Sequence, residues 1–400
     1  MKRIIEIILF FSVLCMSVSC GREDTTEQES VATATQTTEQ EPVATATQTD
    51  ESGDLKHEIW EVTDICGEKK LLDVSNVPES GASVAFDYIF PPARHGQVYE
   101  GHYYYLRREK SSYILYQDEG KKVGSFKANS KYDVIGWAKY GDMFLVRRDS
   151  QEIGVADLKK GTLDMLGTIA ISPAEICNDR IFIYGEEKDL IYTIDLQGNV
   201  IKNYKWEGDD RRYYAVDEKN LYFMENPHDW ENNKYICVDL QTDEKHTIFE
   251  YTRDVLNEPR DNYRVSSEIF KNHGDVFVLD NFSDINVLYI ITENEKKMKE
   301  IINFSEIFTM NDKYIFYTDT KSRIHRWNRK NGKDKIISSF RAGELQCTDD
   351  KLFVQEYVEW PDGDPFDPFE TDAASLYVMD LDGKNMKLLY KGNSEEFWDE

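Results

Sequence analysis

The sequence predicts an all-β protein, a β-propeller of four-stranded antiparallel blades that follows a disordered N-terminal stalk. Three observations predict it. A pattern of paired hairpins recurs along residues 56–400, aromatic residues reach 13% of the chain, and a polar repeat fills the N-terminal region. Aromatic side chains favour strands. The expected domains are a lipoprotein signal peptide over residues 1–19, a lipidated Cys with a linker over residues 20–55, and a propeller over residues 56–400.

The first twenty residues, MKRIIEIILFFSVLCMSVSC, have the layout of an export signal. Lys2 and Arg3 form a positive start, and the apolar stretch from residue 7 to residue 18 is too short to span a bilayer comfortably. The end, Ser-Val-Ser-Cys, resembles a bacterial lipobox, so we expect a lipid on Cys20. The alternative is a plain secretory signal that is cleaved near Ser19. The lipid would anchor the protein to a bacterial membrane and place the rest of the chain outside the cytoplasm.

The linker after Cys20 contains a duplication. Residues 25–36 read TTEQESVATATQ and residues 37–48 read TTEQEPVATATQ. Such a composition buries too little apolar surface to offset the entropy of ordering the chain. The segment from Gly21 to about Leu55 is therefore expected to be a flexible tether.

The repeat of the body is a pair of hairpins. One type has a strand ending in Asp and a polar turn, as in IYTIDLQGNVIKNY at Asp195, YICVDLQTDEKHTIF at Asp239, IGVADLKKGTLDML at Asp157 and LYVMDLDGKNMKLLY at Asp380. A second type, such as EICNDRIFIY from Glu175, precedes most copies. Two hairpins form a four-stranded antiparallel unit, and their spacing is that of a propeller blade.

Seven complete units are expected, after an additional hairpin over residues 57–73. They start near Gly96, Lys131, Ala174, Tyr213, Val265, Phe304 and Leu345. Residues 82–90 could add one more strand, and eight blades with one incomplete is the alternative. Core positions are expected at a phenylalanine that recurs in the second strand, namely Phe144, Phe182, Phe223, Phe277, Phe316 and Phe353.

The LYVMDLDGKNMKLLY type of hairpin resembles the low-density-lipoprotein-receptor-like β-propellers of bacterial surface lipoproteins, many of them domains of unknown function. The resemblance covers most of residues 56–400. The YWTD signature of the receptor propellers is not intact, and YTDT at Tyr317 is the nearest match. The resemblance implies a fold and a location, and it implies no catalytic residues.

Charge and motifs exclude several functions. The formal net charge of −27 argues against nucleic acid as a partner, because phosphate binding needs clustered Lys and Arg. HExxH, GxSxG, a P-loop and a dinucleotide fingerprint are absent from the sequence. The cysteines at 66, 177, 237 and 347 lack zinc-site spacing, so we interpret them as small buried residues of strands. No cofactor is expected, with Ca²⁺ as the alternative discussed below.

Two insertions between second and third strands are the candidate ligand site. They read ENPHDWENNK over residues 225–234 and WPDGDPFDPFETD over residues 360–372. Exposed aromatic rings offer stacking area, and carboxylates accept hydrogen bonds. The candidate ligand-binding residues are Trp230, His228, Trp360, Asp362, Asp364, Phe366, Asp367 and Phe369. Asp362, Asp364 and Asp367 are also the candidate Ca²⁺ ligands, and the alternative role of the aromatic rings is to pin their own loops.

An acidic residue follows the second strand of every unit. The set is Glu109, Asp149, Glu186, Glu225, Asp280, Asp319 and Glu356. These residues suit solvated turns, and the functional alternative is a carboxylate ring around one end of the axis.

The function that the sequence favours is a binding or scaffold module for a protein, peptide or glycan ligand outside the cell. One alternative is a propeller enzyme acting on extracellular polysaccharide or peptide, which would need convergent carboxylates in a pocket. Another is an envelope factor that organises other membrane proteins.

Overall fold

A computed structural model describes residues 58–79 and 96–392, with gaps at residues 110, 128–133, 141–142, 149–151, 170–173, 178–179, 186–189, 206–210, 218, 226–232, 252–263, 283–285, 305–306 and 357–373. The predicted signal peptide, the stalk and the strand expected over residues 82–90 lie outside the described residues.

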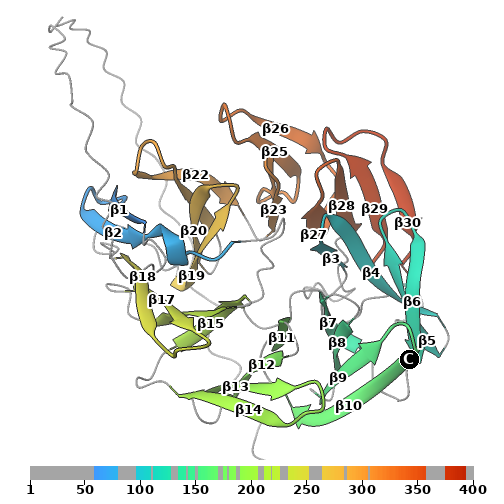
Figure 1. Cartoon of the computed structure of the whole chain (residues 1–400). Helices are drawn as coiled ribbons and strands as arrows, with labels where there is room; N and C mark the ends of the chain where they lie inside the picture. The colour runs from blue at the N-terminus through green and yellow to red at the C-terminus, as the bar shows by residue number, and fades with distance from the viewer. Residues whose placement is uncertain are drawn as a thin grey trace, which may run out of the picture. The chain divides into compact units, whose positions relative to one another are not determined.

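Seven antiparallel sheets make up the body, and each contains a blade of four consecutive strands (Figure 1). Blade 1 contains β3 (Gly96–Tyr99), β4 (His102–Glu109), β5 (Ser112–Gln117) and β6 (Lys121–Lys127). Blade 2 contains β7 (Val134–Tyr140), β8 (Met143–Arg148), β9 (Glu152–Asp157) and β10 (Thr162–Ile169). Blade 3 contains β11 (Ala174–Cys177), β12 (Arg180–Gly185), β13 (Leu190–Asp195) and β14 (Val200–Lys205). Blade 4 contains β15 (Arg211–Val216), β16 (Asn220–Glu225), β17 (Asn233–Asp239) and β18 (Lys245–Tyr251).

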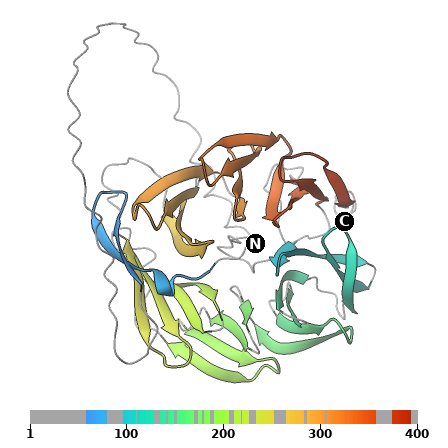
Figure 2. The ribbon, with the colours of Figure 1, turned by 45° about the horizontal axis from the view of Figure 1, so that its top comes forward.

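The last three blades follow the same plan. Blade 5 contains β19 (Arg264–Asn272), β20 (Asp275–Phe282), β21 (Asn286–Ile291) and β22 (Met298–Phe304). Blade 6 contains β23 (Phe308–Met310), β24 (Tyr314–Thr318), β25 (Ile324–Asn328) and β26 (Asp334–Ser338). Blade 7 contains β27 (Ala342–Cys347), β28 (Lys351–Glu356), β29 (Leu376–Asp380) and β30 (Lys387–Tyr390). The predicted seven-bladed propeller is confirmed, because all seven expected units form sheets (Figure 2).

Both faces of each blade are apolar because each blade packs against two neighbours. In β20, Val276 and Val278 belong to the cluster shared with blade 4, whereas Phe277 and Leu279 belong to the cluster shared with blade 6. Successive strand residues point to opposite faces, so a strand that is buried on both faces reads as a continuous apolar run. The six recurring phenylalanines are all buried, as predicted.

Seven hydrophobic clusters hold the ring together, one at each seam between neighbouring blades. The seam between blades 7 and 1 joins Phe353 and Tyr390 to Tyr103 and Tyr105. The ring of Tyr103 stacks on that of Phe353, with centroids 4.1 Å apart. Among the described strands, none of either blade enters the other's sheet, and side-chain packing joins the two blades.

A buried arginine also joins two blades. The Arg329 side chain, which is 6% exposed, donates to the Asn272 backbone oxygen at 2.8 Å and to the Asp275 carboxylate at 2.9 Å. The same guanidinium donates to the backbone oxygen of Asn311 at 2.9 Å. Blade 6 is thereby fastened to the turn between β19 and β20 of blade 5.

The predicted N-terminal hairpin is present, and it widens blade 4 to six strands. β1 (Ile59–Thr63) and β2 (Lys69–Asp73) pair with each other, and Leu72 of β2 pairs with Phe249 of β18. The short 3-10 helix η1 (Val74–Asn76) follows. Hairpin and helix place five apolar side chains in the seam between blades 4 and 5, namely Trp60, Val62, Leu72, Val74 and Val77.

Backbone hydrogen bonds fix the hairpin to blade 5 as well. The Thr63 N–H donates to the Lys296 oxygen at 2.9 Å, and the Lys271 N–H donates to the Pro78 oxygen at 2.7 Å. The hairpin is therefore part of the packing between two blades. The sequence predicted its existence and did not predict where it docks.

Candidate functional site

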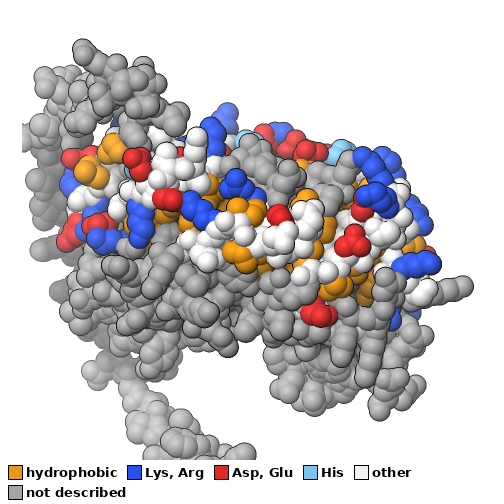
Figure 3. Space-filling view, turned by 60° about the horizontal axis from the view of Figure 1, so that its bottom comes forward, with side chains coloured by type: hydrophobic (Ala, Val, Ile, Leu, Met, Phe, Trp, Pro, Cys, Tyr) orange, Lys and Arg blue, Asp and Glu red, His pale blue; other side chains and the backbone are white. Residues whose placement is uncertain are grey.

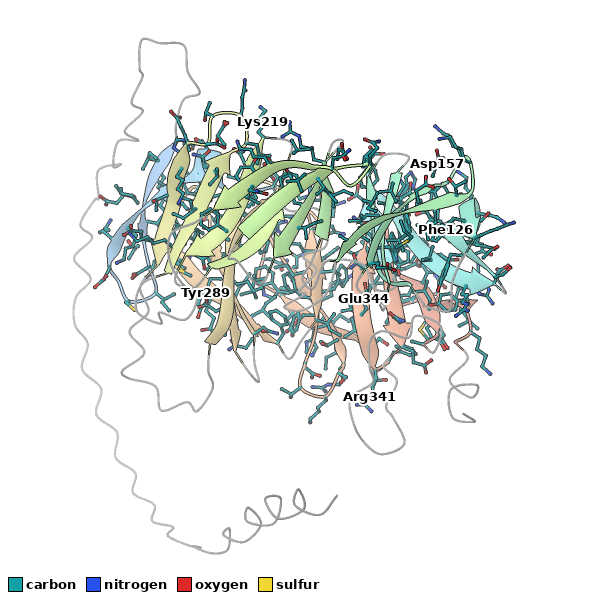
Figure 4. The ribbon with its side chains drawn as sticks, turned by 90° about the horizontal axis from the view of Figure 1, so that it is seen from below. Phe126, Asp157, Lys219, Tyr289, Arg341 and Glu344 are labelled. Atoms are coloured by element: carbon teal, nitrogen blue, oxygen red, sulfur yellow. The ribbon has the colours of Figure 1, made fainter. Side chains whose placement is uncertain are left out.

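The two ends of the propeller differ in what they carry. Strands alternate in direction, so the connections between strands one and two and between strands three and four of each blade emerge at one end, here called the turn end. The connections between strands two and three and the links between blades emerge at the opposite end, called the loop end. In Figure 4, Lys219 and Asp157 of the turn end lie on one side of the ring, and Arg341, in the link between β26 and β27, lies on the other.

The repeated aspartates of the sequence lie at the turn end and close its turns. An oxygen of the Asp195 carboxylate accepts hydrogen bonds from the backbone N–H groups of Gln197 at 2.9 Å and Asn199 at 2.8 Å. Asp157 and Asp239 each accept two backbone N–H groups in the same way. The pKa of Asp195 is lowered, first by the side-chain hydrogen bond from Asn199 and then by backbone donors. These aspartates therefore have a structural role, that of an Asx turn.

The loop end carries the predicted ligand-binding segments. β16 ends at Glu225 and β17 begins at Asn233, while β28 ends at Glu356 and β29 begins at Leu376. Both gaps are connections between second and third strands, so their ends lie at the loop end. The described strand ends that border the two insertions thus lie at the same end of the propeller. The eight candidate ligand-binding residues, from His228 to Phe369, lie outside the described residues, as does Cys20.

The acidic residues that follow second strands have different environments. Asp280 lies within β20 and is fully buried, so it belongs neither to a solvated turn nor to a surface ring. Glu109 is half-buried and accepts a hydrogen bond from the Tyr116 hydroxyl at 2.7 Å. Asp149, Glu186 and the side chain of Glu225 lie outside the described residues. The carboxylate ring stays a prediction for those three positions and is wrong for Asp280.

Blade 6 holds a cluster of titratable groups at the loop end. Asp319 accepts from the Arg323 guanidinium, with Nε at 2.7 Å, and lies 3.3 Å from Nε2 of His325. The other ring nitrogen of His325, Nδ1, lies 2.8 Å from the Asp334 carboxylate. The His325 ring stacks on Tyr317 with centroids 4.8 Å apart and is 12% exposed. The histidine is thus held between two carboxylates.

The side chains of this cluster have a structural role. The pKa of Tyr317 is raised, first by burial and then by the charge of Asp334, so its hydroxyl stays protonated and is a weak acid. Burial alone would raise the pKa of Asp319, but hydrogen bonds from Arg323 outweigh it and lower the pKa far below its usual range. Asp319 also accepts the backbone N–H groups of Lys321 and Arg323, both at 2.9 Å. A carboxylate with so many donors closes its turn and is badly suited to take up a proton in catalysis.

The cysteine interpretation holds for two positions. Cys237 and Cys347 are buried in strands and form no disulfide, and burial raises the pKa of each thiol to about 12. Cys66 is exposed in the turn of the N-terminal hairpin, so the interpretation is wrong for that residue. The side chain of Cys177 lies outside the described residues.

Among the described residues, no three His, Cys, Asp or Glu side chains are grouped so that they could hold a metal ion. Within the same ranges, no helix is long and apolar enough to span a bilayer. The Ca²⁺ prediction at Asp362, Asp364 and Asp367 concerns residues beyond those ranges.

Comparison with known proteins identifies similar structures and no relatives by sequence. No protein-family model matches the chain, and no curated protein matches it. Similar solved structures include BamB from Moraxella catarrhalis, with 11% identity, a TM-score of 0.42, and coverage of 66% of this chain and 90% of that one. Another is PorZ, a surface component of the type-IX secretion system of Porphyromonas gingivalis. It shares 10% identity with a TM-score of 0.43, and the match covers 78% of this chain and 39% of PorZ. The dihydro-heme d1 dehydrogenase NirN shares 10% identity with a TM-score of 0.46, and the match covers 79% of this chain and 81% of NirN.

At identities of 10–11%, these structures assign no function to any residue of this chain. The class of the protein rests on its own topology, which is that of a seven-bladed β-propeller whose first hairpin docks outside the blade series.

Proposed function

We propose that this chain is a binding or scaffold module, held at a bacterial membrane by a lipid on Cys20, whose loop end engages a protein, peptide or glycan outside the cytoplasm. The stalk over residues 20–55 would set the reach of the propeller from the membrane. The resemblance of its hairpins to the low-density-lipoprotein-receptor-like propellers of surface lipoproteins supports both the location and this type of propeller.

The difference between the two ends of the propeller carries the proposal. At the turn end, the carboxylates of the repeat are occupied by the N–H groups of their own turns. At the loop end, the blades bear the connections between Glu225 and Asn233 and between Glu356 and Leu376. Loops that exceed what a connection needs often carry function on a rigid scaffold. The two insertions combine tryptophan, phenylalanine and aspartate, which suits sugar or apolar side chains.

Among the residues that the structure describes, the rim of the propeller offers no comparable feature. The exposed large hydrophobic side chains are scattered over the outer strands and turns, at Ile65, Leu71, Val123, Val200, Ile201, Ile336, Met386 and Leu388. Figure 3 shows hydrophobic side chains lying among charged ones on the side that it presents. Scattered exposed hydrophobic residues are ordinary on soluble surfaces.

Binding is tested by screening the chain without residues 1–20 against peptide and glycan arrays. Trp230→Ala and Trp360→Ala are expected to weaken binding of the captured ligand about tenfold or more, because aromatic anchors dominate such contacts. Lys219→Ala, at the turn end, is the matched control and is expected to bind like the wild type. Unchanged affinity in both tryptophan variants, with a loss of thermal stability instead, would show that the rings only pin their loops.

The anchor is tested by fractionating cells that produce Cys20→Ser. We expect this variant to be released or left unprocessed, because no other residue of the leader has the setting for a lipid. Unchanged processing and membrane retention would contradict the lipid anchor.

A further inference from the structure

The N-terminal hairpin and the residues that follow it form a strap, residues 58–79, that runs through the seam between blades 4 and 5. On the outer side, Leu72 of β2 pairs with Phe249 of β18, the fourth strand of blade 4. On the inner side, the Pro78 oxygen accepts the N–H of Lys271 in β19, the first strand of blade 5, at 2.7 Å. Figure 2 shows the strap in blue, running from the rim toward the middle of the ring.

The seam that the strap fills differs from the other six. Its hydrophobic cluster combines side chains of blades 4 and 5 with five from the strap, namely Trp60, Val62, Leu72, Val74 and Val77. In the part of the chain that the structure describes, the clusters at the remaining seams consist of blade residues alone. Departure of the strap would therefore open this one seam and expose Phe249 of blade 4 and Val278 of blade 5 to water.

The backbone of the strap is attached to the blades at a few isolated points. β1 and β2 pair with each other over five residues each, whereas the described register of β2 on β18 is the single pair at Leu72. Toward blade 5, the strap forms two isolated bridges, Thr63 with Lys297 and Glu79 with Lys271. Within blade 4, by contrast, β16 and β17 share six pairs. The strap is thus a hairpin that is complete in itself and is held in the seam chiefly by its apolar side chains.

Docking of the strap also buries charged groups. The Asp64 carboxylate is fully buried, and one of its oxygens accepts the N–H groups of Cys66 and Glu68 while the other has no hydrogen-bond partner. The corresponding turn aspartates of the blades, such as Asp195, are half-buried. Burial lowers the pKa of the half-buried Lys271, although the acidic residues of the strap raise it. Burial of charge opposes the apolar contacts, so the docked strap is less firmly held than its apolar contacts alone would make it.

We propose that the strap yields to tension on the stalk and opens the propeller between blades 4 and 5, a proposal that rests on the proposed lipid anchor. The chain enters the strap at Glu58 from the side of the stalk. A pull between the membrane and a ligand held by the blades therefore reaches residues 58–79 before it reaches blade 1 at Gly96. The pull acts first on β1, the edge strand of the six-stranded sheet. Without load, the apolar contacts of the strap keep the seam filled and the ring closed.

The experiment stretches single molecules of the chain without residues 1–20 in optical tweezers, with handles attached through azide-bearing amino acids at positions 56 and 127. Lys127 is exposed at the end of β6, so the load passes through the strap and then through blade 1. We expect a first event at lower force that releases the strap and reverses when the load is lowered. It lengthens the molecule by at most about 140 Å, the extended length of residues 57–95. A second event at higher force unfolds blade 1 and adds about 110 Å.

Leu72→Ala is expected to speed the first event at a given force about tenfold or more and to leave the second unchanged. Leu71→Ala, which truncates a side chain that is 67% exposed, should change neither event. A single event that frees the strap together with blade 1 would overturn the proposal, and this result needs no variant to fold. Equal rates of the first event in the two leucine variants would overturn it as well. The stretched chain carries no lipid, so the Cys20→Ser fractionation tests the anchor separately.

Discussion

The docking of the N-terminal hairpin leads to a quantitative prediction. Leu72 is fully buried in the seam between blades 4 and 5, whereas the preceding residue, Leu71, is 67% exposed on the same strand. Truncation of a fully buried leucine to alanine costs about 2–5 kcal/mol, through lost burial and the cavity that remains. We therefore expect Leu72→Ala to lower the free energy of unfolding by about 3 kcal/mol. Leu71→Ala should change it by less than about 0.5 kcal/mol.

The assay is equilibrium unfolding in urea, followed by tryptophan fluorescence and circular dichroism on the chain without residues 1–20. Leu279→Ala, in the seam between blades 5 and 6, gives the cost of the same truncation between two blades. If the hairpin belongs to the cooperative unit, Leu72→Ala and Leu279→Ala shift the midpoint by similar amounts. A midpoint for Leu72→Ala equal to that of Leu71→Ala would refute the reasoning, because the hairpin would then open independently of the blades.

Three further predictions concern the stalk, the thiols and the buried arginine. Deletion of residues 21–52 should leave the melting temperature nearly unchanged, since a disordered tract makes few native contacts, and a fall of many degrees in a thermal scan would contradict this. A maleimide at pH 8 should label Cys66 quickly and Cys237 only after unfolding, because a thiol with a pKa of about 12 is almost wholly protonated there; equal labelling rates in mass spectrometry would contradict it. Arg329→Ala should lower the free energy of unfolding by about 3 kcal/mol, because it leaves buried acceptors unpaired. Substitution of the exposed neighbour, Lys330→Ala, should leave it unchanged, and equal urea midpoints for the two variants would contradict the role of Arg329 in joining blades 5 and 6.

Much of the fold could be predicted because the information is local. Asp157, Asp195 and Asp239 mark hairpins in the sequence since each closes its own turn with hydrogen bonds to residues two to four positions later. The phenylalanine of each second strand marks a position that is buried in every blade in which it occurs. Periodic patterns of this kind report on strand and turn before any tertiary contact is known.

Other features depend on contacts between distant residues, and the sequence did not reveal them. Leu72 and Phe249 are far apart in the chain, and nothing in either segment indicates that they pair. Asp280 looks like a turn residue although its strand extends past it. Gln355 of β28 is buried as well, although a polar residue near a strand end usually signals a solvated edge.

The central claim is that the loop end binds and the turn end is structural. The most direct measurement is hydrogen–deuterium exchange of the chain with and without a ligand captured on the arrays. Our account predicts that protection appears in the peptides that hold residues 226–232 and 357–373 and in the adjoining ends of β16 and β28. Protection confined to the turns at Asp157, Asp195 and Asp239, with none at the loop end, would contradict it.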